Sequence, residues 1–159
     1  MRVSLRAGPE IRAACEAAFE LHRRRVLGVV PEAVVEHMGA TAVPGAVTKG
    51  DVDLLARVPA ASFERSVAAL GSAYSIHQPE NWTSTFASFT DPDAADSPVG
   101  VQLVVTGSED DRLFRGFRDA LIADPGLLGE YNAVKRAHEG EEYGLYTRAK
   151  EAFIERRLR

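Results

Sequence analysis

The segment at residues 37–58, HMGATAVPGAVTKGDVDLLARV, constrains this chain more than any other. Its second half, DVDLLARV, is an apolar run that begins with Asp51 and Asp53 and predicts a β-strand. Side chains two positions apart on a strand point to the same face, so the two carboxylates should lie together. Paired carboxylates supply the oxygen ligands that hard divalent cations prefer. The segment therefore predicts a Mg²⁺ or Mn²⁺ site, held by Asp51 and Asp53, at the start of a core strand.

A glycine turn precedes this strand. Gly39 and Ala40 lie eleven to twelve residues before Asp51, and their backbone N–H groups are expected to bind a phosphate that the same metal holds. An isolated Asp-x-Asp pair often only flanks a strand. Here the turn, the spacing and the apolar run together resemble the nucleotidyltransferase pattern: a hydrophobic residue, Gly, Gly or Ser, a gap, then two aspartates alternating with hydrophobic residues. Residues 38–40 and 51–54 match this pattern at every position except Ala40.

Further motifs narrow the resemblance. The run from His37 to Lys49 resembles the signature H-I-G-S-T-A-V-P-G, followed by lysine, of the GrpB (UPF0157) family. The last third of the chain resembles that family's F-R-D-x-L, Y-x-x-x-K and Y-T-x-x-K-x-x-F-I segments, at residues 117–121, 131–135 and 146–154. The similarity runs from about Val34 to the C-terminus and so covers most of the chain. It implies a nucleotidyltransferase-like fold with a poorly defined biochemical role.

The order of apolar patterns predicts a single α/β domain over residues 1–159. Gly8, Pro9 and Glu10 mark the start of a first helix, and Pro31 breaks it. After Ser108 the chain is expected to be helical to its end. The pattern is typical of a mixed β-sheet of about five strands with packed helices and a helical C-terminal region. The expected strands are 33–36, 51–58, 74–77, 82–90 and 99–106, with a helix at 60–70 and a turn-rich loop at 91–98. The strand at 82–90 is expected from the alternation of its side chains between two faces.

Composition and charge narrow the classes of partner. The chain is 45% hydrophobic and 26% charged, as ordinary globular domains are. Cys15 is the only cysteine, which excludes an internal disulfide. There is no signal-peptide pattern and no apolar run of roughly 20 residues, so we expect a cytoplasmic protein without a membrane partner. The net charge of −4 argues against broad nucleic-acid binding, which depends on a basic surface.

Two positions depart from the patterns that the chain resembles. A third acid from a neighbouring strand usually completes a nucleotidyltransferase metal site, and the GrpB family commonly has histidine there. This chain has Gln102, which is neutral: it can orient a substrate by hydrogen bonds but cannot act as a general base. Ala40 replaces the usual serine, so a hydroxyl that could contact phosphate is missing. We therefore expect ordinary nucleotidyl transfer to be weak or absent.

Cationic side chains that could bind a phosphate are also missing from the middle of the chain. Residues 66–111 contain no lysine or arginine but seven acids. Arg118, next to Asp119 on a helix, should face a different direction from it and is either an anion clamp or an ion-pair partner of another helix. A triphosphate would have to draw on Lys49, Arg115, Arg118, Arg148 or Lys150. The predicted substrate-binding residues are Gly39, Ala40, Thr41, Lys49, Arg118 and Lys150.

Two functions remain open. The first is a divalent-metal-dependent nucleotidyltransferase-like enzyme acting on a small molecule, with Asp51, Asp53, His37 and Gln102 as candidate catalytic residues. It includes acid–base chemistry by the first three that needs no triphosphate, although His37 is equally well explained as a packed core histidine. The alternative is an inactive module that binds a nucleotide, a coenzyme or a protein. The GrpB-like extension of some dephospho-coenzyme A kinases, a family association only, is consistent with that alternative.

Overall fold

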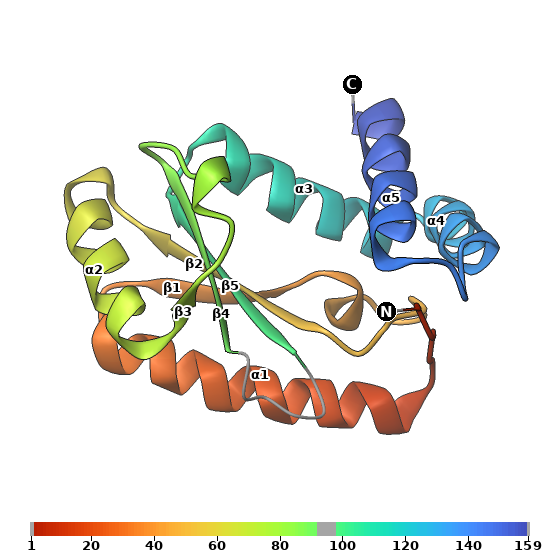
Figure 1. The fold of residues 1–159 in the computed structure, drawn as a ribbon, viewed down its shortest axis with the longest axis horizontal. Coiled ribbons are helices and arrows are strands. Elements are labelled where there is room, and N and C mark those ends of the chain that lie inside the picture. The colour runs from red at the N-terminus through yellow and green to blue at the C-terminus, as the bar shows by residue number, and fades with distance from the viewer. Residues whose placement is uncertain (1, 92–97, 159) are drawn as a thin grey trace.

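The computed structural model describes residues 2–91 and 98–158, which form one sheet with helices on both faces (Figure 1). The strands are β1 (Val34–Met38), β2 (Val52–Val58), β3 (Ser75–Ile76), β4 (Phe86–Asp91) and β5 (Val99–Val105). The helices are α1 (Pro9–Val29), α2 (Phe63–Ala73), α3 (Glu109–Ala123), α4 (Pro125–Ala137) and α5 (Tyr143–Leu158). Short 3₁₀ turns lie at Ala40–Ala42, Ala60–Ser62 and Pro79–Asn81.

The strands of the sheet lie in the order β1-β2-β5-β4-β3. β2 and β5 are parallel, and the other neighbouring pairs are antiparallel. Two neighbours flank Asp53, because β1 places Met38 beside it and β5 places Gly100 on its other side. The prediction that residues 34–36 and 51–58 form adjacent strands of a mixed sheet is confirmed.

Helices bury both faces of β2, which explains why its sequence is a nearly continuous apolar run. Val52, Leu54, Ala56 and Val58 belong to the main core with buried residues of α1 and α2. Leu55 points the opposite way and packs with Met38 and Val104. Figure 1 shows α1 along one face of the sheet, with α3, α4 and α5 on the other side. Asp53 alternates with its buried neighbours and therefore shares the face of Leu55.

A second core joins the loop after Gly39 to the C-terminal helices. Val43 and Ala46 pack with Leu121 of α3, Tyr131 of α4 and Phe153 of α5. The burial of these five side chains holds the three helices beside the start of β2. Helices distant in sequence are thereby brought to the paired aspartates.

The predicted strand at 82–90 is wrong in its first half, because β4 begins at Phe86. The Trp82 indole N–H donates to the carbonyl of His77 (3.0 Å) and to the hydroxyl of Ser88 (3.3 Å), and its ring lies 5.2 Å from that of Phe89. The alternation that suggested a strand therefore belongs to a packed turn. Other boundaries moved less: β3 covers only Ser75–Ile76, and α2 starts at Phe63. Residues 92–97 of the predicted loop lie outside the described residues.

Candidate functional site

Asp53 lies where two glycines leave space for its carboxylate. A methyl group placed on Gly39 would come within 2.6 Å of Asp53 Oδ2, and one on Gly100 within 2.9 Å of Oδ1. Gly39 also has a φ of 73°, a conformation that side chains disfavour. Glycine is thus required at the turn for two reasons, and the carboxylate fits between the turn and β5.

Three charged side chains and one amide act on Asp53. Burial, and to a smaller extent the neighbouring charge of Asp51, raise its pKa to about 6. Lys150, Lys49 and a hydrogen bond from the side chain of Gln102 act in the opposite direction. Gln102 thus lies on the same side of the sheet as Asp53, while Val101 and Leu103 belong to the core with α1 and α2. Because the negative charge of Asp51 raises the pKa of Asp53, a cation bound beside them would stabilise the ionised form of Asp53.

Asp51 precedes β2 and is held by the loop. Its Oδ2 lies 2.6 Å from Nζ of Lys49, and its backbone carbonyl accepts a hydrogen bond from Oγ1 of Thr41 (3.1 Å). Thr41 is buried and also lies 2.9 Å from Nε2 of His37. The threonine hydroxyl is therefore engaged within the protein, where it ties the turn to Asp51.

Three lysines converge on a cavity of about 80 Å³ beside the paired aspartates. Lys49 comes from the loop, Lys135 from α4 and Lys150 from α5. Lys135 is 1% exposed and donates to the carbonyl of Val47. Within residues 2–91 and 98–158, neither Lys135 nor Lys150 forms an ion pair. The lining residues are Gly39, Ala40, Thr48, Lys49, Asp51, Asp53, Tyr131, Lys135, Tyr146 and Lys150.

Burial and mutual repulsion lower the pKa values of two of these lysines. Burial, and to a smaller extent the charges of Lys150 and Lys49, lower the pKa of Lys135 to about 7. Burial also lowers the pKa of Lys150, and the charge of Lys49 adds to that effect. Like charges held together in a cavity favour the arrival of an anion. Sequence reasoning missed Lys135 as a site residue, although the Tyr131-x-x-x-Lys135 spacing placed both on one helix face.

A larger cavity, of about 450 Å³, adjoins the first. It shares Gly39, Ala40, Asp53 and Tyr131 with the lysine cavity. Most of its other lining is apolar, from β1, α3 and α5: Met38, Leu113, Phe114, Phe117, Leu121 and Ile154. Gln102, Asp110 and Arg118 complete it. Asp53 therefore stands at the junction of a cationic space and an apolar one.

Arg118 and Arg115, both candidate phosphate ligands, are engaged in ion pairs. Arg118 donates to Glu36 (3.0 Å) and to the carbonyl of His37 (3.3 Å). Its Nε also donates to Asp119 (2.9 Å), so the expectation that these two neighbours face apart is wrong. A long arginine side chain can turn back along the helix to reach the next residue. Arg118 lines the larger cavity as an ion-pair partner of β1.

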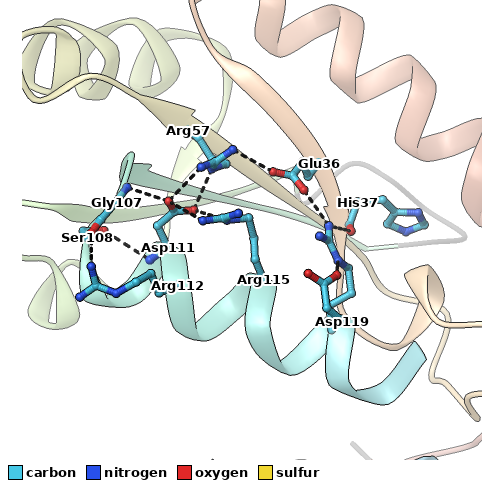
Figure 2. Close-up of polar contacts among 10 residues, drawn as sticks. Glu36, His37, Arg57, Gly107, Ser108, Asp111, Arg112, Arg115 and Asp119 are labelled. Atoms are coloured by element: carbon cyan, nitrogen blue, oxygen red, sulfur yellow. Dashed lines mark hydrogen bonds and ion pairs between the residues drawn. The ribbon is translucent and has the colours of Figure 1, made fainter. Parts of the chain in front are cut away.

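Asp111 is the centre of the network in Figure 2. It is fully buried and accepts hydrogen bonds from Arg57 (2.8 and 3.2 Å), Arg115 (2.9 and 3.3 Å) and the backbone N–H of Gly107 (2.8 Å). Arg57 also donates to Glu36 (3.2 Å). The network fixes α3 against β1 and β2, and so positions one wall of the larger cavity.

His37 lies apart from both cavities. Its ring stacks on Phe19 of α1, with 4.7 Å between centroids, on the opposite side of β1 from Met38. Burial lowers its pKa to about 4, which keeps the imidazole neutral near pH 7. The structure therefore brings Asp51, Asp53, Gln102, Lys49 and Lys150 together but does not bring His37 to them.

The donor set fits a divalent ion that also takes ligands from a bound molecule. The described residues contain no group of three His, Cys, Asp or Glu side chains that could hold a metal. Asp51 and Asp53 alone supply two carboxylates, and Mg²⁺ commonly binds one or two carboxylates together with phosphate oxygens. The lysine cavity beside them is where such a phosphate would lie.

The buried lysine leads to a pH-dependent prediction. Lys135→Met should raise the free energy of unfolding by about 2 kcal/mol at pH 6, because wild type must bury a charge there. The unfolded lysine keeps its proton up to about pH 10.5, whereas the folded one loses it near pH 7. Wild type therefore gains stability as pH rises from 7 to 10, and the advantage of the variant should shrink. Urea unfolding at pH 6, 8 and 9.5 measures this, and a constant gap would contradict the assignment.

Comparison with known proteins identifies the family. The family described as GrpB protein matches residues 10–159, nearly the entire chain. The chain belongs to the GrpB family. A UPF0157 protein of Vibrio cholerae is 34% identical over 149 residues, covering 94% of this chain and 78% of that protein. A UPF0157 protein of Deinococcus radiodurans is 32% identical over 146 residues, covering 89% and 74%.

Solved structures show the fold of this GrpB protein. The conserved protein GrpB from Enterococcus faecalis aligns with a TM-score of 0.68 at 15% identity, over 98% of this chain and 100% of that chain. The Cid1 poly(U) polymerase with MgGTP bound aligns at 0.57 and 11% identity, over 82% of this chain but 43% of its own. A cytoplasmic RNA terminal U-transferase aligns at 0.58 and 15% identity, over 82% and 41%. The fold is nucleotidyltransferase-like.

Among the described helices, none combines the length and apolar character that a membrane-spanning segment requires.

Proposed function

We propose that this protein is a divalent-metal-dependent nucleotidyltransferase-like enzyme whose cleft binds a phosphorylated small molecule. The observation that carries the proposal is the position of Asp53: it is enclosed by the Gly39 turn and Gly100, beside Asp51, and faces three lysines. The fold of a polymerase described with MgGTP bound supports the same ligand class. Asp51 and Asp53 would hold Mg²⁺ or Mn²⁺, which when bound would neutralise charge on the phosphate.

The side chains of this chain have separate tasks in that proposal. Lys150 and Lys49 offset the negative charge of the phosphate, and Lys135 adds to them when protonated. Gln102 orients the carboxylate of Asp53 through its amide. The backbone of the Gly39 turn borders both cavities and can donate N–H groups without a side chain intervening. Binding and orientation thus rest on the lysines, the amide and the turn.

A second candidate, a binding module without catalysis, is favoured by one observation. Gln102 occupies the strand position where a third acid would complete the metal site, and Lys49 already pairs with Asp51. Loss of one charge at a two-metal site can remove several kcal/mol of transition-state stabilisation. The two candidates share the ligand and differ in turnover.

The first test concerns metal-dependent binding. Thermal unfolding of the wild type should shift upward with inorganic pyrophosphate and nucleoside triphosphates only when Mg²⁺ or Mn²⁺ is present. Asp53→Asn should abolish the part of the shift that depends on the divalent ion and leave the fold intact. Glu64→Gln, an exposed acid on α2, serves as the control and should behave as wild type. Equal shifts in Asp53→Asn and wild type would rule out the proposed metal ligand.

Turnover is measured separately by pyrophosphate release. Wild type, Gln102→Glu and Gln102→His are incubated with each nucleoside triphosphate and Mg²⁺. We expect slow or absent release by wild type, with Gln102→Glu at least as active because it restores an acid. Robust release by wild type that Gln102→Glu loses would show that the amide suits the chemistry, and that weakened transfer is the wrong interpretation.

A further inference from the structure

The larger cavity beside Asp53 is suited to a different chemical group from the lysine cavity. Its volume of about 450 Å³ lies in the range of small-molecule pockets, roughly 300–1,000 Å³, whereas the lysine cavity of about 80 Å³ has room for little more than a phosphate. Because the two cavities share Asp53 and Gly39, one ligand can occupy both. The larger space would then receive the organic part of that ligand.

The charges of the larger cavity argue against an anionic group there. The guanidinium of Arg118 is neutralised by Glu36 and Asp119. Asp110 is half-buried, and across the described residues its carboxylate forms no hydrogen bond or ion pair. Burial and the charge of Glu109 raise the pKa of Asp110. When Asp53 holds a divalent ion, Asp110 still leaves the larger cavity with a negative charge among its described lining residues, so a phosphate is favoured among the lysines instead.

The apolar side chains that line the larger cavity can attract the organic part of a ligand. Phe114 and Leu113 of α3 line the cavity and are 38% and 45% exposed, so both leave apolar surface open to solvent. Phe117 and Leu121 lie further in, the former edge-on to Tyr131 at 5.2 Å between centroids. Exposed apolar side chains at the mouth of an apolar cavity are typical of a ligand site.

We propose that this cavity binds an apolar group, aliphatic or aromatic, that belongs to the same molecule whose phosphate lies among Lys49, Lys135 and Lys150. The inference rests on the proposed phosphate binding and adds the character of the remaining part of the ligand. Recognition there is by burial of apolar surface, because the side-chain amide of Gln102 and the guanidinium of Arg118 are already engaged. Each methylene group that the cavity buries should tighten binding roughly fourfold.

The test compares ligands that carry the same diphosphate. Isothermal titration with Mg²⁺ present measures binding of inorganic pyrophosphate, geranyl diphosphate and ADP to the wild type. We expect at least one of the two organic diphosphates to bind at least tenfold more tightly than pyrophosphate. A gain for geranyl diphosphate identifies an aliphatic group, and a gain for ADP alone identifies a nucleobase as the apolar group.

Matched variants show whether the tighter binding of an organic diphosphate depends on the larger cavity. Leu113→Asp puts a charge at the cavity mouth, whereas Ile122→Asp does so elsewhere on α3, at a residue 51% exposed and outside the cavity lining. Leu113→Asp should remove the tenfold gain but leave pyrophosphate binding unchanged, and Ile122→Asp should keep both. Phe114→Ser, at a second exposed lining residue, repeats the test. If pyrophosphate binds but neither organic diphosphate binds more tightly, this inference is wrong and the proposed function stands. The same holds if Leu113→Asp leaves the tighter binding of the organic diphosphate intact. If pyrophosphate does not bind, the proposed function fails with it.

Discussion

Asp111→Ala should lower the free energy of unfolding by about 3 kcal/mol, a large part of the stability of a domain of this size. The carboxylate is fully buried and receives two arginines and one backbone N–H. Its removal leaves Arg57, among the described residues, with Glu36 as its remaining side-chain partner (3.2 Å), and leaves the Gly107 N–H without its acceptor. Arg115 is 31% exposed and can turn to water, which limits the loss. Urea unfolding at neutral pH measures the change.

Asp110→Ala is the matched control for this network. Asp110 is the preceding residue on α3, yet it joins none of the contacts of Asp111. We expect it to change the unfolding free energy by less than about 0.5 kcal/mol. Similar losses in both variants would show that the effect comes from the helix start and not from the buried ion pairs.

The pH dependence of the network has a definite sign. Burial alone would raise the pKa of Asp111, but hydrogen bonds from Arg57, the Gly107 N–H and Arg115 outweigh it and lower the pKa below 3.8. A lowered folded-state pKa means that the stabilisation is present above the unfolded pKa and is lost as pH falls through the folded one. Wild type should therefore lose stability in acid more steeply than Asp111→Ala. Parallel acid curves would contradict the assignment.

Gly39→Ala should weaken metal-dependent pyrophosphate binding more than tenfold. Its new methyl group would lie 2.6 Å from Oδ2 of Asp53, so the carboxylate must move from its position between the turn and β5. The φ of 73° and ψ of −174° add backbone strain, of order 1–3 kcal/mol, that lowers stability as well. Isothermal titration and urea unfolding separate the two effects.

Gly45→Ala separates strain from the loss of the site. Gly45 lies in the same loop with a φ of 85°, but a methyl group there would meet only Leu128, at 3.5 Å. It should lower stability to a similar degree while leaving pyrophosphate affinity within about twofold of wild type. An equal loss of affinity in both variants would mean that the loop conformation, and not the position of Asp53, controls binding.

Local patterns in the sequence were sufficient for the elements that are regular and well buried. The apolar run DVDLLARV predicted β2, because side chains on both faces of that strand enter a core. Ser108 and Asp111 predicted the start of α3, where the serine side chain accepts from the Asp111 N–H. The same rules failed at Trp82, since hydrogen bonds to His77 and Ser88 hold that residue in a turn that alternates like a strand. Alternation reports which side chains are buried, not which backbone groups are paired.

The sequence by itself determined the family, through motifs spread from about Val34 to the C-terminus. It also determined the strand that carries the paired aspartates and the glycine turn before it, because these two depend only on neighbouring residues of the segment 37–58. Only the tertiary structure decided which distant groups meet them. It brought Lys135 and Lys150 to Asp53, since packing of Val43 and Ala46 on α3, α4 and α5 holds those helices there. It engaged Arg115 and Arg118 in ion pairs and directed His37 toward α1. Side-chain partners across a fold follow from packing geometry, which no local pattern encodes.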